Sequence, residues 1–220
     1  MTQPTTDPSH ADLVAGLRDL GGGLVSAGLV LGSGGNLSAR VAGAEVALVT
    51  ARGCWLDRLS PTDFSLVRLA DGAVVGGAAS PSTELALHLE CYRARPDVTA
   101  VVHVHPQTSV LLAALGHPIR MITTDHVAYV REVRVSPYRH PGTLLLATEA
   151  AALLAEVDCV VLAHHGCTVV ADSIEMAHRR VLNLEEAARL TYAALLLGDA
   201  TTACPPSYRL RLEGRADSDH

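Results

Sequence analysis

Lysine is absent from the 220-residue chain, and aromatic residues make up only 3% of it, with one tryptophan and one phenylalanine. With so few rings available, the core has to be built from leucine, valine and alanine. An excess of basic charge is also missing, because 17 arginines stand against 23 acidic residues and give a formal net charge of −6. This balance argues against a nucleic-acid partner.

Long apolar segments and export signals are missing as well. No uninterrupted apolar run reaches the ~18 residues that indicate a membrane span. The first ten residues, MTQPTTDPSH, have neither the basic nor the apolar region of a signal peptide. The five cysteines form no C-x-x-C pair, and without an export signal their odd number indicates reduced thiols, with Cys91 and Cys159 buried. We therefore expect a cytoplasmic protein without a membrane partner.

Apolar residues make up 49% of the chain, which is ample for a large core, and no segment resembles a linker. We expect a single domain over residues 1–220, with frayed polar ends at 1–10 and 213–220. Helical and strand segments alternate, which favours an α/β or α+β fold with a sheet covered by helices.

Periodicity and capping residues locate the individual elements. Helices are expected at 11–20 (ended by Gly21-Gly22-Gly23), 82–95 (capped by Ser82 or Thr83), 107–115, 148–156 and 174–197. Strands are expected at 37–40, 45–50, 66–69, 73–75, 98–105, 157–163 and near 127–135. On the last helix, Glu185 and Arg189 are expected to pair on the face toward water.

A surplus of histidine, 11 residues in all, suggests metal binding or proton transfer. His103 and His105 end a predicted strand two positions apart, so both imidazoles lie on one face and can reach one ion. The pair His164-His165 follows the apolar strand 157–163, and alternation sends only one of its side chains to a given face. Three neutral imidazoles with an open fourth position suit Zn²⁺. The alternative is a set of buried histidines that bond only to the backbone.

Further polar segments stand at a predicted helix start and in two loops. In Pro81-Ser82-Thr83-Glu84, the hydroxyls and the backbone N–H groups of the helix start form a candidate anion site. Glu84 either complements the helix dipole or, beside three histidines, acts as a fourth ligand, a general base, or both. The loops 32–36 (GSGGN) and 50–53 (TARG) could hold a phosphate through backbone amides and Arg52, although ordinary turns are the alternative.

Taken in order, these segments resemble the class II aldolase/adducin family, and within it the L-fuculose-1-phosphate aldolase group. The resemblance covers roughly residues 11–198. It rests on GSGGNLS at 32–38, TARG at 50–53, PSTE at 81–84, RPDVTAVVHVH at 95–105 and HHG at 164–166.

The resemblance implies a role for each matching residue. His103, His105 and His165 would bind one zinc ion per subunit. Glu84 would coordinate the resting metal and act as general base, and His164 would point away. The family's phosphate site would fall on Ser33, Gly35, Asn36, Gly53, Ser82 and Thr83. Arg52 stands where the family usually has threonine, so it would add charge for a phosphate or suit another anionic group.

The activity that the resemblance implies is aldol cleavage or condensation of a ketose 1-phosphate, of the L-fuculose or L-ribulose 1-phosphate type. The products of cleavage would be dihydroxyacetone phosphate and an aldehyde, formed through an enediolate that zinc stabilises. Tyr208 matches the family's C-terminal tyrosine. A second family tyrosine has no match near Thr123, and Asp125, His126 or Tyr129 are candidates to replace it.

The family fold implies a three-layer α-β-α arrangement with a central, mainly antiparallel sheet, and a homotetramer with sites between subunits. Other members of the family are alternatives, namely a phosphorylated sugar-acid decarboxylase, in which Arg52 would suit a carboxylate, and a ribulose-phosphate 4-epimerase. An adducin-like binding module without metal is a further alternative, but such a module has no need for the histidines and Glu84.

Overall fold

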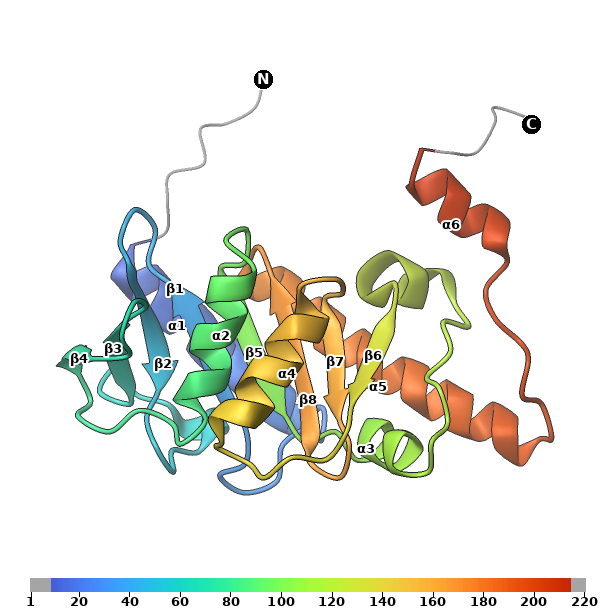
Figure 1. Cartoon of the computed structure of the whole chain (residues 1–220), viewed down its shortest axis with the longest axis horizontal. Coiled ribbons are helices and arrows are strands. Elements are labelled where there is room, and N and C mark those ends of the chain that lie inside the picture. The colour runs from blue at the N-terminus through green and yellow to red at the C-terminus, as the bar shows by residue number, and fades with distance from the viewer. Residues whose placement is uncertain (1–8, 215–220) are drawn as a thin grey trace.

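An eight-stranded sheet runs through residues 9–214, the part of the chain that the computed structural model describes (Figure 1). Across the sheet the strands follow the order β4-β3-β2-β1-β5-β8-β7-β6. In chain order they are β1 (Asn36–Arg40), β2 (Val46–Thr50), β3 (Phe64–Arg68), β4 (Val74–Gly77), β5 (Ala100–Val104), β6 (Val133–Ser136), β7 (Cys159–Leu162) and β8 (Gly166–Ala171). All neighbours pair antiparallel except β6 and β7, which are parallel. The predicted strand pairs at 37–50 and 66–75 are confirmed.

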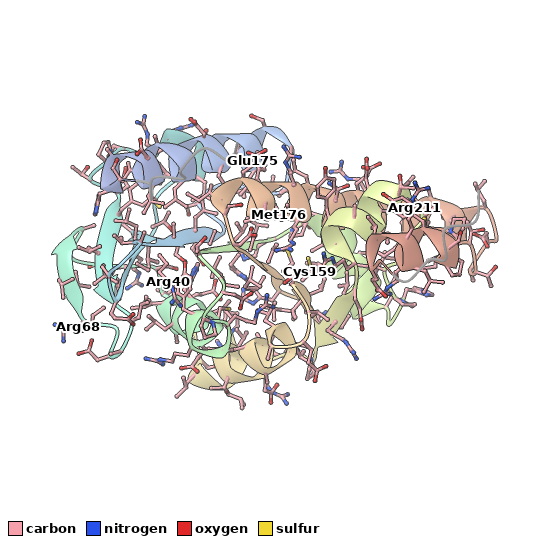
Figure 2. All side chains as sticks on the ribbon, turned by 90° about the horizontal axis from the view of Figure 1, so that it is seen from above. Arg40, Arg68, Cys159, Glu175, Met176 and Arg211 are labelled. Carbon is pink, nitrogen blue, oxygen red and sulfur yellow. The ribbon has the colours of Figure 1, made fainter. Side chains whose placement is uncertain are left out.

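Helices cover both faces of this sheet, as the view from above shows (Figure 2). The α-helices are α1 (His10–Ser26), α2 (Leu85–Ala94), α3 (Gln107–Ala114), α4 (Leu144–Leu154), α5 (Ile174–Leu196) and α6 (Pro206–Leu212), and η1 (Leu56–Arg58) is a 3-10 turn. One core lies between the sheet and helices α1 and α5, and a second between the sheet and helices α2 and α4. The three-layer arrangement is therefore confirmed.

Both cores are aliphatic, as the scarcity of aromatic residues requires. Among the described residues, Phe64 and Tyr92 are the only aromatic side chains in the buried apolar set. Cys91 and Cys159 are free and fully buried, as predicted, and burial raises the pKa of each thiol to about 12. No helix in residues 9–214 is both long enough and apolar enough to cross a bilayer.

The first helix does not end at its three glycines. α1 continues through them to Ser26, and two of the glycines allow neighbouring elements to approach the helix closely. A Cβ on Gly21 would stand 2.3 Å from the carbonyl oxygen of Leu56, and one on Gly23 would stand 2.6 Å from the ring of His178. These glycines serve close packing within a helix rather than its termination.

The region near 127–135 was predicted as strand and is only partly so. Residues His126–Val130 form a π-helical turn, η2, and the strand is confined to β6. α4 begins at Leu144, four residues before its predicted start, with Thr143 as its N-cap. Strand β8 and helix α6 were not predicted.

The predicted pair of Glu185 and Arg189 forms, with Nε of Arg189 3.5 Å from Oε1 of Glu185, but the prediction that Glu185 faces water is wrong. Glu185 is 3% exposed, and its carboxylate accepts hydrogen bonds from the backbone N–H groups of Thr108 and Ser109 and from the Ser109 hydroxyl, at 2.8–3.0 Å. Glu185 thus caps the N-terminus of α3, while its partner Arg189 is exposed. A carboxylate at a helix N-terminus also complements the helix dipole.

The predicted frayed ends lie mostly outside the described residues. Within the described residues, Ser9 is the N-cap of α1 and forms a capping box with Asp12, and His10 is the first residue of the helix. Glu213 and Gly214 directly follow α6.

Candidate active site

Four side chains that are remote in sequence converge at one edge of the central strands. Glu84, His103, His105 and His165 each offer a potential metal-ligand atom, and these atoms all lie within 4.8 Å of one another. Nε2 of His103 lies 3.2 Å from Nε2 of His105 and 3.0 Å from Oε2 of Glu84. Nε2 of His165 lies 3.5 Å from Oε1 of Glu84. The predicted cluster is thus assembled as the strand pattern requires.

Strand pairing places the histidines. β5 lies between β1 and β8, with His103 opposite Asn36 on one side and opposite Thr168 on the other. Nδ1 of His103 lies 3.2 Å from the Thr168 hydroxyl, so Nε2 is the nitrogen that faces the cluster. His105 follows directly after the strand.

His165 stands in the tight turn between β7 and β8. His164 adopts a left-handed conformation there (φ 61°), so its side chain is exposed and lies outside the cluster, as predicted. The next residue has to be glycine, because a Cβ on Gly166 would stand 2.6 Å from the ring of His105. The His-His-Gly motif therefore combines a turn, a cluster residue and a close approach.

Glu84 enters the cluster from the opposite direction, at the N-terminus of α2. It occupies the N-cap position that was predicted for Ser82 or Thr83, and its side chain makes no capping hydrogen bond. Glu84 is 7% exposed, and its carboxylate points instead at His103 and His165. Its role as a mere complement of the helix dipole is thereby disfavoured.

The electrostatics of the cluster suit a cation. Burial raises the pKa of Glu84, but the hydrogen bond and the charge of His103, together with His165 and Asn36, outweigh burial and hold that pKa below its usual range. Burial, followed by the charge of His103, lowers the pKa of both His105 and His165 to about 4. At neutral pH the cluster therefore presents the anionic carboxylate of Glu84 and, at His105 and His165, imidazoles with free lone pairs.

One buried atom tests whether a metal ion would fit. Oε1 of Glu84 is buried and has no hydrogen-bond partner among the described residues. A buried carboxylate oxygen without a partner is costly. Three imidazoles and a carboxylate are a donor set that Zn²⁺ and related divalent ions accept. The residues present therefore fit a bound metal ion.

The three loops predicted to bind phosphate meet beside this cluster. Thr50 joins them, because its hydroxyl accepts a hydrogen bond from the Leu37 N–H and its carbonyl accepts one from the Ser82 N–H. The Arg52 N–H also donates to the carbonyl of Ser80. Loop 50–53 is thus tied to Leu37, directly after loop 32–36, and to segment 81–84, and these three segments together form the rim of the cluster.

The individual loop residues differ in what they offer. Four of the predicted phosphate contacts are exposed, namely Ser33, Arg52, Gly53 and Thr83. Ser82 is buried, and its hydroxyl accepts a hydrogen bond from the Glu84 N–H. A Cβ on Gly35 (φ 81°) would stand 2.8 Å from the carbonyl oxygen of His103, so only glycine fits there. The buried side chain of Asn36 is engaged by Glu84 and His88.

The predicted proton donors lie elsewhere in the chain. Figure 1 shows α3, which follows His105, at the lower edge of the molecule, whereas α6, which carries Tyr208, lies at the upper right near η2. His126 in η2 is buried and accepts hydrogen bonds from the N–H groups of Ile122 and Thr123. Within one chain, neither α6 nor η2 is brought to the cluster.

Two features beside the cluster were not predicted. A buried chain of hydrogen bonds runs from Tyr92 through Ser38, His88 and Asn36 to Glu84. Its one sequence signal is the helical spacing of Glu84 and His88, four residues apart.

The second feature that was not predicted is the loop 137–143. A Cβ on Gly142 in this loop would stand 3.3 Å from the Thr83 carbonyl, and Tyr138 packs edge-on against His164.

Known proteins resemble this chain in sequence and in fold. The chain is 31% identical over 176 residues to a 5-deoxy-D-ribulose 1-phosphate aldolase of Bacillus thuringiensis serovar kurstaki, covering 80% of this chain and 82% of that protein. It is 36% identical over 177 residues to a 3-oxo-tetronate 4-phosphate decarboxylase of Escherichia coli K12, with 78% and 81% covered. A solved L-fuculose 1-phosphate aldolase superposes with a TM-score of 0.85 at 28% identity, over 94% of this chain and 97% of that one.

The family model for the class II aldolase and adducin N-terminal domain matches residues 16–192. That range contains the whole cluster and all three loops of the rim. The sheet, the Glu84–histidine cluster and this match agree, and the chain belongs to the class II aldolase and adducin family.

Proposed function

We propose that this protein catalyses the zinc-dependent aldol cleavage or condensation of a ketose 1-phosphate, giving dihydroxyacetone phosphate and an aldehyde. The observation that carries the proposal is the position of the cluster beside the rim of three loops. Hydrogen bonds of Thr50 hold these loops together. Such a rim can hold a phosphate while the cluster acts on the neighbouring carbons. A substrate whose phosphate is held in place also has its reacting carbons held in a fixed orientation, and this lowers the barrier to reaction.

The proposed metal ligands are His103, His105 and His165, with Glu84 as a fourth ligand in the resting state, and one zinc ion per subunit. A zinc ion bound there supplies Lewis-acid polarisation of the substrate carbonyl. The absence of lysine supports this route, because the alternative way to polarise a ketose carbonyl is a lysine Schiff base. The chain has no side chain for that chemistry.

Glu84 is the proposed general base. Its carboxylate is ionised at neutral pH, buried and aimed at the cluster, so it can take a proton from the substrate carbon and return it. The proposed phosphate contacts are Ser33, Gly35, Asn36, Arg52, Gly53, Ser82 and Thr83. Arg52 supports charge recognition, because its side chain is exposed.

Tyr208 is the proposed proton donor to the aldehyde oxygen, in a site completed by a second copy of the chain. The position of α6 on the far side of the molecule supports a contribution in trans (Figure 1). We accordingly propose a cytoplasmic homotetramer of single-domain chains over 1–220, with active sites between subunits.

Decarboxylation of a phosphorylated 3-oxo sugar acid is the second candidate. It is favoured by the 36% identity to the 3-oxo-tetronate 4-phosphate decarboxylase, and by exposed Arg52, which offers a carboxylate a bidentate partner. The same cluster would serve both reactions, so only the products separate them.

The test is release of dihydroxyacetone phosphate from L-fuculose 1-phosphate and L-ribulose 1-phosphate by the zinc-loaded protein, with and without a chelator. Release that the chelator abolishes is expected. No release from either substrate, combined with CO₂ release from a 3-oxo-tetronate 4-phosphate, would replace the aldolase proposal with the decarboxylase.

A further inference from the structure

A chain of five buried polar groups lies behind the cluster, on the side of α2. The Tyr92 hydroxyl lies 2.7 Å from Oγ of Ser38, and that Oγ lies 2.6 Å from Nδ1 of His88. Nε2 of His88 lies 2.6 Å from Oδ1 of Asn36, whose Nδ2 lies 3.1 Å from Oε2 of Glu84. The chain therefore reaches the general base without passing through solvent.

These hydrogen bonds have only one consistent direction. An ionised carboxylate only accepts, so the Asn36 NH₂ group has to donate to Glu84 and the Asn36 carbonyl has to face His88. His88 must then donate from Nε2. In a neutral ring this leaves Nδ1 as an acceptor for the Ser38 hydroxyl, and Ser38 in turn accepts from Tyr92.

His88 is held in that single state by its surroundings. The ring is fully buried, in the layer between the sheet and α2. Burial, followed by the charge of His103, lowers the pKa of His88 to about 3, so the imidazole is neutral at physiological pH. Both ring nitrogens are hydrogen-bonded, and the ring cannot turn without breaking both contacts.

We propose that His88 is a positioning residue that, through Asn36, fixes the orientation of the Glu84 carboxylate. Oε2 is held as an acceptor for Asn36, and Oε1, which lies 3.5 Å from Nε2 of His165 but has no hydrogen-bond partner among the described residues, is the oxygen turned to the substrate. This inference rests on the proposed function of Glu84 as general base. It also gives Asn36 a task in addition to its proposed phosphate contact.

The kinetic test compares His88→Leu, which removes the donor to Asn36, with His88→Gln, whose amide can still donate there. A misplacement of about 1 Å can cost on the order of 100-fold in rate. We expect His88→Leu to lower kcat on the order of 100-fold, and His88→Gln to recover at least about tenfold of that loss. KM should stay within about threefold, and one zinc ion should remain bound per chain.

The matched control is His178→Gln, a histidine of α5 on the opposite face of the sheet, which should leave kcat unchanged. Three results would overturn the proposal. They are an unchanged kcat in His88→Leu, equal losses in His88→Leu and His88→Gln, and a loss of zinc that accounts for the fall.

A second measurement needs neither activity nor metal. In the metal-free protein labelled with ¹⁵N-histidine, the nitrogen shifts of His88 should report a neutral ring with its proton on Nε2 at pH 7. Ser38→Ala should loosen this preference, because it removes the donor to Nδ1. A proton on Nδ1 in the unaltered protein would refute the inference.

The two failures are distinguishable. If the unaltered protein releases no dihydroxyacetone phosphate but His88 carries its proton on Nε2, the proposed function is wrong and the hydrogen-bond chain stands. If it releases dihydroxyacetone phosphate and the proton is on Nδ1, the proposed function stands and the role of His88 is wrong.

Discussion

His164 and His165 are neighbours in sequence but differ in surroundings, and this difference provides a matched pair of variants. His165→Ala removes an imidazole from the cluster, whereas His164→Ala removes an exposed ring outside it. We expect the first variant to lose its zinc on dialysis and the second to keep one equivalent per chain. Metal analysis of the dialysed proteins measures both, and full zinc in His165→Ala would contradict the proposed ligand set.

Glu84→Gln separates metal binding from proton transfer. The amide keeps the size and one oxygen of the side chain, so the three histidines should still hold zinc. Loss of a general base lowers the rate by about 10²–10⁴-fold. The measurement is exchange of the dihydroxyacetone phosphate α-proton with deuterated water, and exchange at the rate of the unaltered protein would mean that another group is the base.

Burial of neutral His88 makes stability depend on pH. Its pKa is about 3 in the folded protein and about 6.5 when unfolded, so the unfolded state binds the extra proton. The contribution is complete above pH 6.5 and is lost as pH falls toward 3, by about 2 kcal/mol between pH 6.5 and pH 5. Urea unfolding of the metal-free protein should show this slope, and His88→Gln should reduce it; equal slopes would contradict the assignment.

At the level of residues, local pattern was sufficient where strand alternation decides the geometry. The pair His103 and His105 is such a case, whereas the choice of one ring from His164-His165 is set by the left-handed turn at His164. The environment of Glu185 could not be predicted, because its partners Thr108 and Ser109 are more than 70 positions away in sequence. The chain from Asn36 to His88 is equally non-local, since it crosses from a strand start to a helix interior.

Single elements in this protein depend on contacts at their ends, and α3 gives a direct test. Glu185→Ala leaves the N–H groups of Thr108 and Ser109 buried without their acceptor, at a cost of about 2 kcal/mol in the free energy of unfolding. The neighbouring exposed residue supplies the control, because Glu186→Ala should change that free energy by less than about 0.5 kcal/mol. Equal values for the two variants would show that the cap does not stabilise α3.

Element boundaries were predictable where caps and turns are local. α5 begins after Ser173, which bonds to the Met176 N–H, and ends before Gly198 (φ 82°), as the sequence indicates. The end of α1 could not be predicted in this way. Gly21 and Gly23 lie inside the helix and allow close contacts with Leu56 and His178, which are distant in sequence. Short valine-rich segments such as 127–135 are compatible with strand or helix until their packing partners are known.

At the level of the whole molecule, the three layers followed from alternating helices and strands together with the family resemblance. The C-terminal part is different. α6 contains no buried residue, and Leu197 at the end of α5 is 87% exposed. Exposed apolar residues at the end of α5 and in α6 are consistent with the proposed contact between subunits.

Mixed oligomers test whether the site is shared between chains. Glu84→Gln and Tyr208→Phe chains should each have little activity alone. If Tyr208 acts on a neighbouring site, a hybrid of the two contains sites with both native residues, and activity should return after co-refolding. If activity does not return although hybrids form, Tyr208 does not act in trans.

The position of β5 between β1 and β8 also determines when the cluster can assemble during folding. Glu84, His103 and His105 precede His165 by a long stretch of chain, so during synthesis three members of the cluster emerge well before the fourth. The β7–β8 hairpin then closes the sheet against β5 and delivers His165 in the same event. Non-local pairings of this kind form late in folding. If the cluster binds a metal ion as proposed, tight binding requires a completed sheet, and a truncated or stalled chain lacks the full set of proposed ligands.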